Sequence, residues 1–392
     1  MAATMKAVKV AEDRSAIVKD VPVPENYLPY QILIKVKAVG ANPTDWKHLV
    51  YRLGSVDSTV GCDASGVIVN LGKDEEEAKY ITENFGFQVG DFVTGVVHGC
   101  SVAHPENGAF AEYALLDAQL ATKFTAKSTD GYEEGKNLGD SINSGLPIDS
   151  FEKAASLPVS LYTAVMVLTL NLGKKLDFEN TEWQDSESTL MIYGGATGFS
   201  QNLLQLNKLT KAFKNVITVA SSQHEASLKK WGVVENFDYK TAGFLDDIVK
   251  KYPSVKYVLD AVSSESTFTD SYNIAKKLYK DEKITVINLM GWDNTKVPAE
   301  NRDDEKVSVT TTLLYLALGL DVPFGAFTLP ADPLYRKTAI ENIPKLQTIV
   351  SNGSLKSIAI TINEKEGLEG AIDAVEGVKL GKNKGEKFIA RI

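Results

Sequence analysis

A short segment rich in glycine is a candidate binding site for phosphate groups. An apolar run at 190–193 leads into a turn at 194–198, and leucines with helical spacing follow. Small residues let the backbone approach a pyrophosphate, and a helix start supplies unpaired N–H groups and the positive end of its dipole. The turn therefore predicts a dinucleotide site, formed by Gly194, Gly195, Ala196, Thr197 and Gly198. Thr197 and Ser200 stand where a stricter fingerprint has glycine, so an ordinary strand-to-helix corner is the alternative.

The end of the next predicted strand carries hydroxyl groups and no carboxylate. An NAD site usually has an acidic residue about 20 residues beyond the turn, where it binds the ribose 2′-hydroxyl. Ser221 and Ser222 stand here instead, and the first carboxylate is Glu225. Serine hydroxyls can donate to a 2′-phosphate, so the sequence predicts NADPH rather than NADH. Capping of the next helix is a second role for the two serines. Further donors are expected from nearby turns: Lys229, Tyr239 and Lys240.

Alternating apolar and helical segments surround the glycine turn and must position it. Further strands are expected at 216–220, 233–237, 255–261 and 284–290, and helices at 226–231, 244–251 and 268–278. Parallel neighbours need helical crossovers, so five such strands predict an α/β domain with a doubly wound parallel sheet. The turn follows the first strand, where such sheets bind ligands. A flavodoxin-like or other α/β domain would show the same alternation.

The N-terminal part has a different pattern of predicted elements. Short strands are expected at 7–10, 16–18, 31–38, 64–70, 92–97 and 110–115, separated by Gly, Pro and Asp turns. This pattern predicts a largely antiparallel β region. The polar insertions at 73–87 and 128–150 are predicted to be surface loops.

Length and composition fit an intracellular enzyme with two domains. A chain of 392 residues exceeds what one core usually supports, and a net charge of −9 argues against nucleic acid or anionic membrane as a partner. Cys62 and Cys100 are too few for a disulfide framework or a structural zinc cluster. The first residues lack the apolar core of a signal peptide, and the apolar stretch at 313–320 is too short to span a bilayer. A cytoplasmic location is therefore expected.

Six short motifs occur in one order along the chain. They are Ala41-Asn42-Pro43-Thr44-Asp45, Gly61-Cys62-Asp63-Ala64-Ser65-Gly66-Val67, Val89-Gly90-Asp91-Phe92-Val93, Gly108-Ala109-Phe110-Ala111-Glu112-Tyr113, Leu157-Pro158 with Thr163-Ala164, and the glycine turn. In this order they resemble the medium-chain dehydrogenases/reductases, over essentially the whole chain. The chain looks most like the zinc-independent quinone oxidoreductase and enoyl reductase branch, close to fungal zinc-type alcohol dehydrogenase-like proteins.

The resemblance implies two domains with the active site in the cleft between them. A GroES-like, β-rich catalytic domain is expected at 1–158 and is completed by 328–392, while a Rossmann-type cofactor-binding domain is expected at 159–327. A segment at 355–362, a helix at 368–376 and a strand at 387–392 fit the return to the first domain. Dimerisation is common in this family, so a homodimer is one expectation.

Zinc is not expected. Catalytic zinc needs three protein ligands and a water. In the zinc-dependent relatives a cysteine stands at the position of Asn42, and a His-Glu pair stands at Cys62-Asp63, so neither ligand pattern is kept. A site built from Cys62, Cys100, His98 and His104 would lack any recognised ligand spacing.

Without a metal, hydrogen-bond donors must polarise the substrate. Family positions suggest Asn42, whose amide would orient nicotinamide or substrate, and Tyr51, whose phenol would supply a proton. Lys47 is a further option. The structural alternatives are that Asn42 only shapes the turn before Pro43, and that Tyr51 is a surface aromatic residue.

Other positions are predicted from the resemblance to contact the cofactor. Thr163 matches a family threonine near it, with helix packing as the alternative. Leu289 and Met290 end the strand where family members contact the nicotinamide carboxamide through the backbone. Asp260 is expected to be a structural carboxylate at a strand end. His48 and His224 are expected to be exposed or to cap helices.

The sequence thus predicts an NADPH-dependent oxidoreductase that reduces an aldehyde, an enone or a quinone by hydride transfer. A trans-enoyl thioester reductase is an alternative within the enzyme class. A low-turnover NADPH-binding sensor that kept the fold is the alternative outside it.

Overall fold

The computed structural model describes residues 3–325 and 327–392. The chain forms two compact units: the first comprises Met1–Tyr162 and Tyr315–Ile392, and the second comprises Thr163–Leu314. The domain limits expected from the sequence are 158/159 and 327/328, whereas the compact units divide at 162/163 and 314/315. The second limit lies earlier because the ring of Tyr315 stacks on that of His98 in the first unit, with 4.0 Å between ring centroids.

The first unit is built on an eight-stranded sheet with the order β7-β5-β4-β3-β18-β17-β8, and β6 pairs with β3. The strands are β3 (Gln31–Gly40), β4 (Asp63–Leu71), β5 (Phe92–Val96), β6 (Tyr113–Asp117), β7 (Thr122–Lys123), β8 (Ser141–Ile142), β17 (Ile360–Ile362) and β18 (Lys387–Arg391). The pairs of β3 with β4, β6 and β18 are antiparallel, which confirms the predicted β-rich region, and the pair of β17 with β18 is parallel. The C-terminal strand β18 therefore lies inside the sheet, next to β3.

Two smaller pairs of strands complete the β structure of this unit. β1 (Thr4–Val10) pairs antiparallel with β2 (Ala16–Pro22), and β15 (Val322–Phe324) pairs with β16 (Phe327–Leu329). The strand expected at 110–115 is displaced to β6. The reason is that Phe110 and Ala111 bond to β1 instead, through the Val8 N–H to the Phe110 carbonyl and an Ala7–Ala111 bridge.

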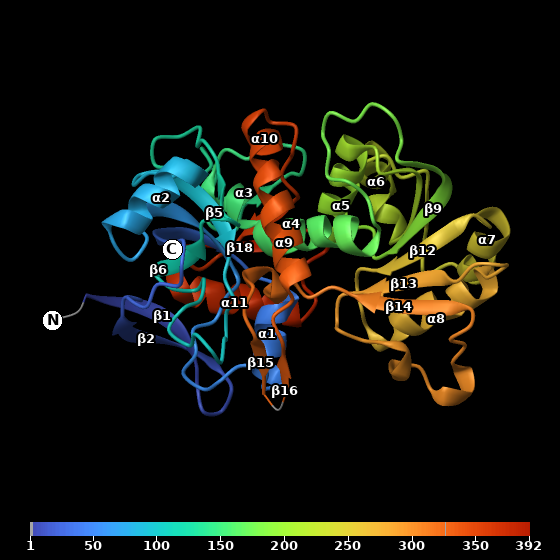
Figure 1. Cartoon of the computed structure of the whole chain (residues 1–392), viewed down its shortest axis with the longest axis horizontal. Helices are drawn as coiled ribbons and strands as arrows, with labels where there is room; N and C mark the ends of the chain where they lie inside the picture. The colour runs from blue at the N-terminus through green and yellow to red at the C-terminus, as the bar shows by residue number, and fades with distance from the viewer. Residues whose placement is uncertain (1–2, 326) are drawn as a thin grey trace. The chain divides into compact units, whose positions relative to one another are not determined.

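Helices pack against the strands of the first unit, with α3 on β3 and β4 and α11 on β18 (Figure 1). They are α1 (Pro43–Val50), α2 (Glu75–Phe85), α3 (Phe151–Ala155), α9 (Pro333–Asn342), α10 (Leu346–Ser351) and α11 (Gly367–Lys379), and α4 (Pro158–Met166) begins in this unit. The prediction of a surface loop at 73–87 is wrong, because α2 occupies most of it. The Asp74 carboxylate caps this helix at the Glu77 N–H, Ile81 is buried, and Gly86 ends the helix in a left-handed conformation.

The second unit is a parallel sheet of six strands in the order β11-β10-β9-β12-β13-β14. Its strands are β9 (Asp185–Tyr193), β10 (Phe213–Val219), β11 (Glu235–Phe237), β12 (Val255–Asp260), β13 (Ile284–Asn288) and β14 (Val307–Thr311). Numbered along the unit, this order is 3-2-1-4-5-6, the Rossmann arrangement, and it confirms the predicted fold class. The sequence predicted five strands and missed β14, because this edge strand is mostly half-buried and polar.

Helices connect these strands. They are α5 (Gly198–Thr210), α6 (Glu225–Lys230), α7 (Phe244–Lys251) and α8 (Glu265–Leu278). Phe268 and Tyr272 of α8 and Ile248 of α7 join one core with Met191 and Val258 of the sheet, so these two helices cover the same face (Figure 1). Among the helices of residues 3–325 and 327–392, none has the length and apolar character needed to cross a bilayer.

Candidate cofactor and active site

The predicted phosphate-binding turn begins where β9 ends, and its backbone packs tightly on β10. Gly194 has φ of +85°, a conformation that side chains disfavour. The N–H groups of Gly194 and Gly195 both donate to the Val219 carbonyl, at 2.8 and 3.2 Å. A Cβ atom at Gly195 would lie 2.5 Å from the Cβ of Thr218, so this position requires glycine.

The start of α5 leaves hydrogen-bond donors for an anion. Thr197 caps the helix through its hydroxyl oxygen, which accepts from the Ser200 N–H, and the Ser200 hydroxyl donates to the Gly194 carbonyl at 2.8 Å. Ser200 therefore closes the turn at a place where a stricter fingerprint has glycine. The N–H groups of Gly198 and Phe199 have no acceptor within the helix. A helix of 13 residues that begins in this way fits a pyrophosphate by its geometry and its dipole.

The end of β10 carries the two predicted serines and also a carboxylate that the sequence analysis did not place there. The Ser222 N–H donates to Asp238 Oδ2 at 2.9 Å, and the Lys240 N–H donates to Asp238 Oδ1 at 2.9 Å. No carboxylate precedes Glu225 in this segment, as the sequence shows, but the turn after β11 brings Asp238 to it. Asp238 follows β11, whose Phe237 is paired with Val219 of β10, so the sheet brings the two turns together.

The other predicted donors near the serines lie in the exposed surroundings of this turn. Tyr239 is 48% exposed, and Lys240 Nζ lies 5.8 Å from the centroid of its ring. Lys229 pairs with Glu225 at 2.6 Å on α6. Positive and negative side chains are thus mixed around the serines.

Asp260 ends β12 as a structural carboxylate, as the sequence suggested. Its Oδ1 accepts from the N–H groups of Ser263 and Val262, at 2.8 and 3.1 Å, and its Oδ2 accepts from the Thr267 hydroxyl at 2.9 Å. Burial raises the pKa of Asp260 to about 6, against the opposing effect of these donors. The carboxylate therefore organises the loop before α8.

Leu289 and Met290, which are predicted to contact the cofactor, already donate their N–H groups to acceptors within the protein. The Leu289 N–H donates to the Ser263 hydroxyl at 2.9 Å, and the Met290 N–H donates to Asn288 Oδ1 at 3.0 Å. A nicotinamide carboxamide at these residues would therefore use their carbonyl oxygens rather than their N–H groups. Thr163 is half-buried on α4.

In the first unit, Asn42 belongs to a buried polar network. Its N–H donates to Asp45 Oδ2 at 2.7 Å and its backbone begins α1. Its side-chain amide donates to Asp63 Oδ2 at 2.9 Å and to the Gly40 carbonyl at 3.2 Å, and its Oδ1 accepts from Lys387 Nζ at 2.9 Å. Both amide protons of Asn42 therefore have acceptors within the protein.

Asp63 is the centre of this network. It is fully buried, its Oδ2 forms an ion pair with the Lys387 ammonium, and its Oδ1 accepts from the Val159 N–H at 2.7 Å. The network thus joins β4, β18 and the starts of α1 and α4. The sequence analysis did not single out Lys387. A lysine directly before the apolar run 388–390 was the available signal, because a buried ammonium requires a partner.

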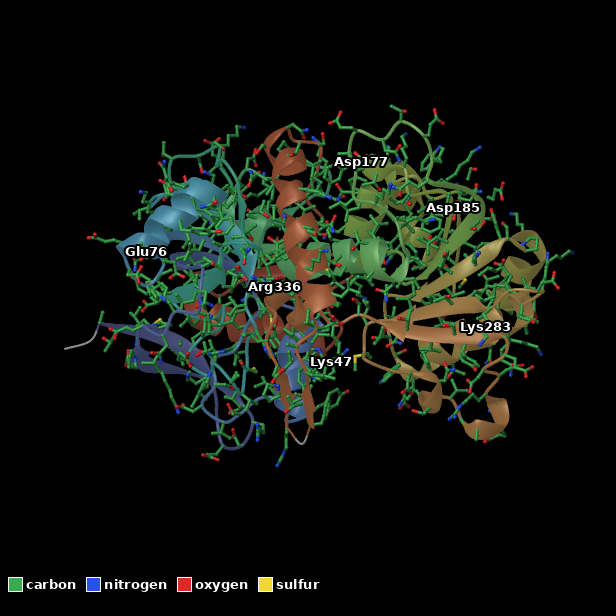
Figure 2. The ribbon with its side chains drawn as sticks, viewed as in Figure 1. Lys47, Glu76, Asp177, Asp185, Lys283 and Arg336 are labelled. Atoms are coloured by element: carbon green, nitrogen blue, oxygen red, sulfur yellow. The ribbon has the colours of Figure 1, made fainter. Side chains whose placement is uncertain are left out.

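The two other catalytic candidates differ in their surroundings. Lys47, labelled in Figure 2, is on α1, and its Nζ lies 5.8 Å from the centroid of the Trp46 ring. Burial lowers the pKa of Lys47. Tyr51 follows the same helix and is 53% exposed.

Rings and hydroxyls form a buried cluster beside α1, which we call the aromatic–hydroxyl cluster. The Tyr315 hydroxyl is 2.6 Å from Thr44 Oγ1 and 3.5 Å from Cys62 Sγ. The rings of His48, His98 and Phe324 lie around Tyr315, with centroid distances of 5.5, 4.0 and 6.1 Å. The cluster comprises Thr44, His48, Cys62, His98, Tyr315 and Phe324.

The expectation that His48 is exposed or caps a helix is wrong, because it lies inside this cluster and is 3% exposed. His48 follows Thr44 by one helical turn, and its Nδ1 is 2.9 Å from the Thr44 carbonyl. His224 lies in a turn, where its ring contacts Gln223.

Burial dominates the titration of this cluster and its neighbours. It lowers the pKa of His48 and lowers that of His98 to about 3, so both imidazoles are neutral at physiological pH. It raises the pKa of Cys62 well above its usual value and raises that of Asp45 to about 7. The cluster is thus composed of neutral rings, a hydroxyl pair and an un-ionised thiol.

Comparison with known proteins supports the fold and the family. The family description "Alcohol dehydrogenase GroES-like domain" matches residues 28–126. Protein YNL134C of Saccharomyces cerevisiae is 38% identical over 391 residues, which covers 99% of this chain and 97% of that protein. The trans-enoyl reductase ccsC of Aspergillus clavatus is 28% identical over 380 residues, covering 93% of this chain and 90% of that protein. The chain belongs to the medium-chain dehydrogenase/reductase superfamily.

Solved structures share the fold of this superfamily member along its whole length. The quinone oxidoreductase from Coxiella burnetii has a TM-score of 0.66 and 22% identity, and the match covers 100% of both chains. The CurK enoyl reductase has a TM-score of 0.64 and 18% identity, with 99% of each chain covered. These two likenesses show that the fold is shared over the whole chain, in agreement with its membership of the superfamily.

The side chains at the zinc-ligand positions of this superfamily member do not fit a metal. Asn42 and Asp63 both bind the Lys387 ammonium, whose positive charge would repel a cation at these positions. Within the residues that the structure describes, no three His, Cys, Asp or Glu side chains are grouped so that they could hold a metal ion.

Proposed function

We propose that this protein is an NADPH-dependent reductase that transfers hydride to an aldehyde, an enone or a quinone without zinc. The observation that carries the proposal is the turn at 194–198. Its backbone packs on β10 so closely that Gly195 admits no side chain, and it opens onto the start of α5. This arrangement is the one that a pyrophosphate needs.

The choice of NADPH is supported by the donors near the end of β10. Ser221 and Ser222 stand where an NAD site has its acidic residue, Lys229 lies on the following helix α6, and Tyr239 and Lys240 lie in the adjoining turn. The mycobacterial protein Rv1454c, which is 18% identical and has a TM-score of 0.66 with this chain, was solved in complex with NADPH.

The cofactor supplies the hydride, and the protein must then stabilise negative charge on the substrate and deliver a proton. Of the three predicted candidates, Lys47 is the best supported as proton donor. Burial lowers its pKa, which makes its ammonium a better acid near neutral pH. Asn42 has both amide protons engaged, which favours a role in holding the start of α1. Tyr51 is largely exposed and adjoins the same helix.

A trans-enoyl reductase activity is the second candidate. Besides ccsC, the trans-enoyl reductase RAP2 of Pyricularia oryzae is 26% identical over 400 residues and covers 97% of this chain. In this reaction hydride adds to the β-carbon of an unsaturated thioester, and the resulting enolate takes a proton at the α-carbon. The same lysine could supply that proton.

The state of the two cysteines supports a proposal for the cellular location. We propose a cytoplasmic enzyme acting on a small molecule, because the two cysteines are free and buried, as is usual in reducing compartments. A homodimer is the proposed assembly, and sedimentation of the purified protein would test it.

The decisive experiment is to follow nicotinamide absorbance while the purified protein meets NADPH and a panel of aldehydes, enones, quinones and enoyl thioesters. We expect turnover with at least one class. Lys47→Met should lower kcat about 100-fold or more, in line with the usual contribution of a general acid. Lys35→Met is the matched control, because Lys35 is an exposed lysine on β3.

Two outcomes would contradict the proposal. Binding of NADPH without turnover of any substrate would favour the sensor alternative. Equal activity of Lys47→Met and Lys35→Met would remove Lys47 from the chemistry. Turnover of enoyl thioesters alone would select the second candidate.

A further inference from the structure

We propose that Asp238 is a specificity-determining residue that weakens the preference of this protein for NADPH over NADH. The inference rests on the proposed nucleotide function and concerns the adenosine end of the cofactor. It is carried by the contact between the Asp238 carboxylate and the serine turn after β10.

The contact is fixed by the pairing of two strands. β10 and β11 run parallel, and the Ala220 N–H donates to the Phe237 carbonyl at 3.0 Å just beyond the last paired residues. The turns after both strands therefore leave the sheet side by side. Asp238 is the first residue after β11, and this places its carboxylate at the Ser222 N–H.

The carboxylate is ionised and held on both oxygens. The Lys240 N–H and the Ser222 N–H donate to it, and these bonds, with one from the Ser222 side chain, hold the pKa of Asp238 below its usual value. Each carboxylate oxygen still has a lone pair, so the group can accept a further hydrogen bond. Its negative charge is present at every pH at which the enzyme would work.

Ser222 cannot serve two anions at once. Its N–H is a donor that a 2′-phosphate at this turn would use, and it is already engaged by Asp238. A phosphate monoester carries a charge of about −1.5 to −2 at neutral pH, so it would also be repelled by the carboxylate. A ribose 2′-hydroxyl is a donor as well as an acceptor, and it can donate to that same carboxylate.

The positive charges nearby do not remove this effect. Lys229 is paired with Glu225 at 2.6 Å, and Lys240 Nζ lies over the Tyr239 ring. The charges of Glu225, Lys229, Asp238 and Lys240 therefore sum to zero at this turn. Neutralising Asp238 changes the balance to one net positive charge, which favours the phosphorylated cofactor.

The test compares affinities for two cofactors rather than activity. NADPH and NADH are titrated into the whole protein, and each Kd is measured by calorimetry at low ionic strength. Asp238→Asn keeps an oxygen that can accept from a backbone N–H and removes the charge. We expect the ratio Kd(NADH)/Kd(NADPH) to rise about fivefold or more in this variant, and the rise to shrink in about 0.3 M salt because exposed charges are screened.

Two further variants make the test specific. Asp246→Asn changes the net charge equally at an exposed carboxylate on α7 that pairs with Lys277, so the ratio should stay at the wild-type value. Asp238→Ser is a second neutral replacement with an acceptor oxygen. If Asp238→Asn does not fold, the same rise is expected for Asp238→Ser.

The outcomes separate the inference from the proposed function. If wild type binds neither cofactor, the nucleotide function itself falls, and the inference falls with it. If wild type binds but the neutral variants keep the wild-type ratio, the inference alone is wrong. A selective loss of NADPH affinity in both neutral variants would also overturn it, because Asp238 would then position the serines for the phosphate instead of opposing it.

Discussion

The Lys387 ammonium forms an ion pair with the Asp63 carboxylate, although 324 positions separate the two residues in the chain. Both side chains are buried, at 7% and 0% exposure. The same carboxylate accepts from Asn42 and Val159, so one negative charge is satisfied from three other segments. Charges this deeply buried are stable only when they are paired and hydrogen-bonded.

Removing one partner of this pair should destabilise the first unit strongly. Lys387→Met leaves the Asp63 carboxylate buried without its cation, and we expect a loss of about 3–5 kcal/mol in the free energy of unfolding. Urea denaturation would measure it. The double variant Lys387→Met/Asp63→Asn should recover part of the loss, whereas Lys365→Met in the exposed pair with Asp373 should cost less than about 1 kcal/mol. Comparable losses for Lys387→Met and Lys365→Met would contradict this account.

The glycine turn should tolerate no methyl group at Gly195. A Cβ atom added at Gly195 would lie 2.5 Å from Thr218 Cβ. Thr218 belongs to the sheet and cannot move aside easily. We expect Gly195→Ala to reduce dinucleotide affinity about tenfold or more, because the turn must shift away from β10. Calorimetric titration measures this. Gly95→Ala in the first unit is the control, since its Cβ would meet the Leu116 side chain at 3.0 Å or more and lies outside the turn.

The His98 ring should make the protein less stable in acid. Its folded pKa of about 3 lies below the usual 6.5, so between these values the unfolded chain binds a proton that the folded chain does not. Stability is therefore lost as pH falls from about 6.5 toward 3. His98→Phe keeps a ring beside Tyr315, and the difference between wild type and variant should change by about 2 kcal/mol between pH 7 and 4.5. If wild type and His98→Phe lost stability in parallel as the pH falls, this role of His98 would be refuted.

Asp45 should have the opposite pH dependence. Its folded pKa of about 7 lies above the usual 3.8, so the folded chain holds the proton more tightly between these values. The stabilisation is present at low pH and is lost as pH rises through 7. Asp45→Asn can still accept from the Asn42 N–H, and it should gain about 2 kcal/mol relative to wild type from pH 5 to 8. A constant difference over this range would show that Asp45 is ionised throughout.

Both cysteines should resist thiol reagents in the folded protein. Cys62 and Cys100 are about 1% and 2% exposed, and burial raises the pKa of both thiols. Since the thiolate is the reactive form, labelling requires opening of the first unit. With a disulfide reagent we expect no reaction in native buffer and two equivalents in denaturant. Rapid labelling of one native thiol would contradict the buried position of that residue.

The elements that depend on local pattern could be predicted from the sequence. The strand before the glycine turn, the helix at 244–251 and the strand at 255–260 appear essentially where hydrophobic spacing placed them. The edge strand β14 was missed because its Ser and Thr residues lack the apolar signal of a buried strand. The helix α2 was missed because its charged residues outweighed the spacing of Ala78, Ile81 and Phe85.

The parts of the site that depend on pairing between distant segments could not be predicted. Lys387 meets Asn42 and Asp63 only because β18 lies beside β3. Asp238 meets Ser222 only because β11 lies beside β10. His48 is buried because the ring of Tyr315, a residue that follows the whole second unit in the sequence, packs against it. Each of these contacts requires knowledge of strand order, which motifs do not contain.

Because β18 lies inside the sheet, the first unit cannot complete its fold until this strand has been synthesised. During synthesis, residues 163–314 leave the ribosome before β18 is made. This strand lies between β3 and β17 in the sheet. The second unit can thus fold during translation, while the first unit must wait, with Asp63 uncompensated, until β18 has been made. A premature stop just before Lys387 would leave the polypeptide without the strand that lies between β3 and β17 in the sheet of its first unit.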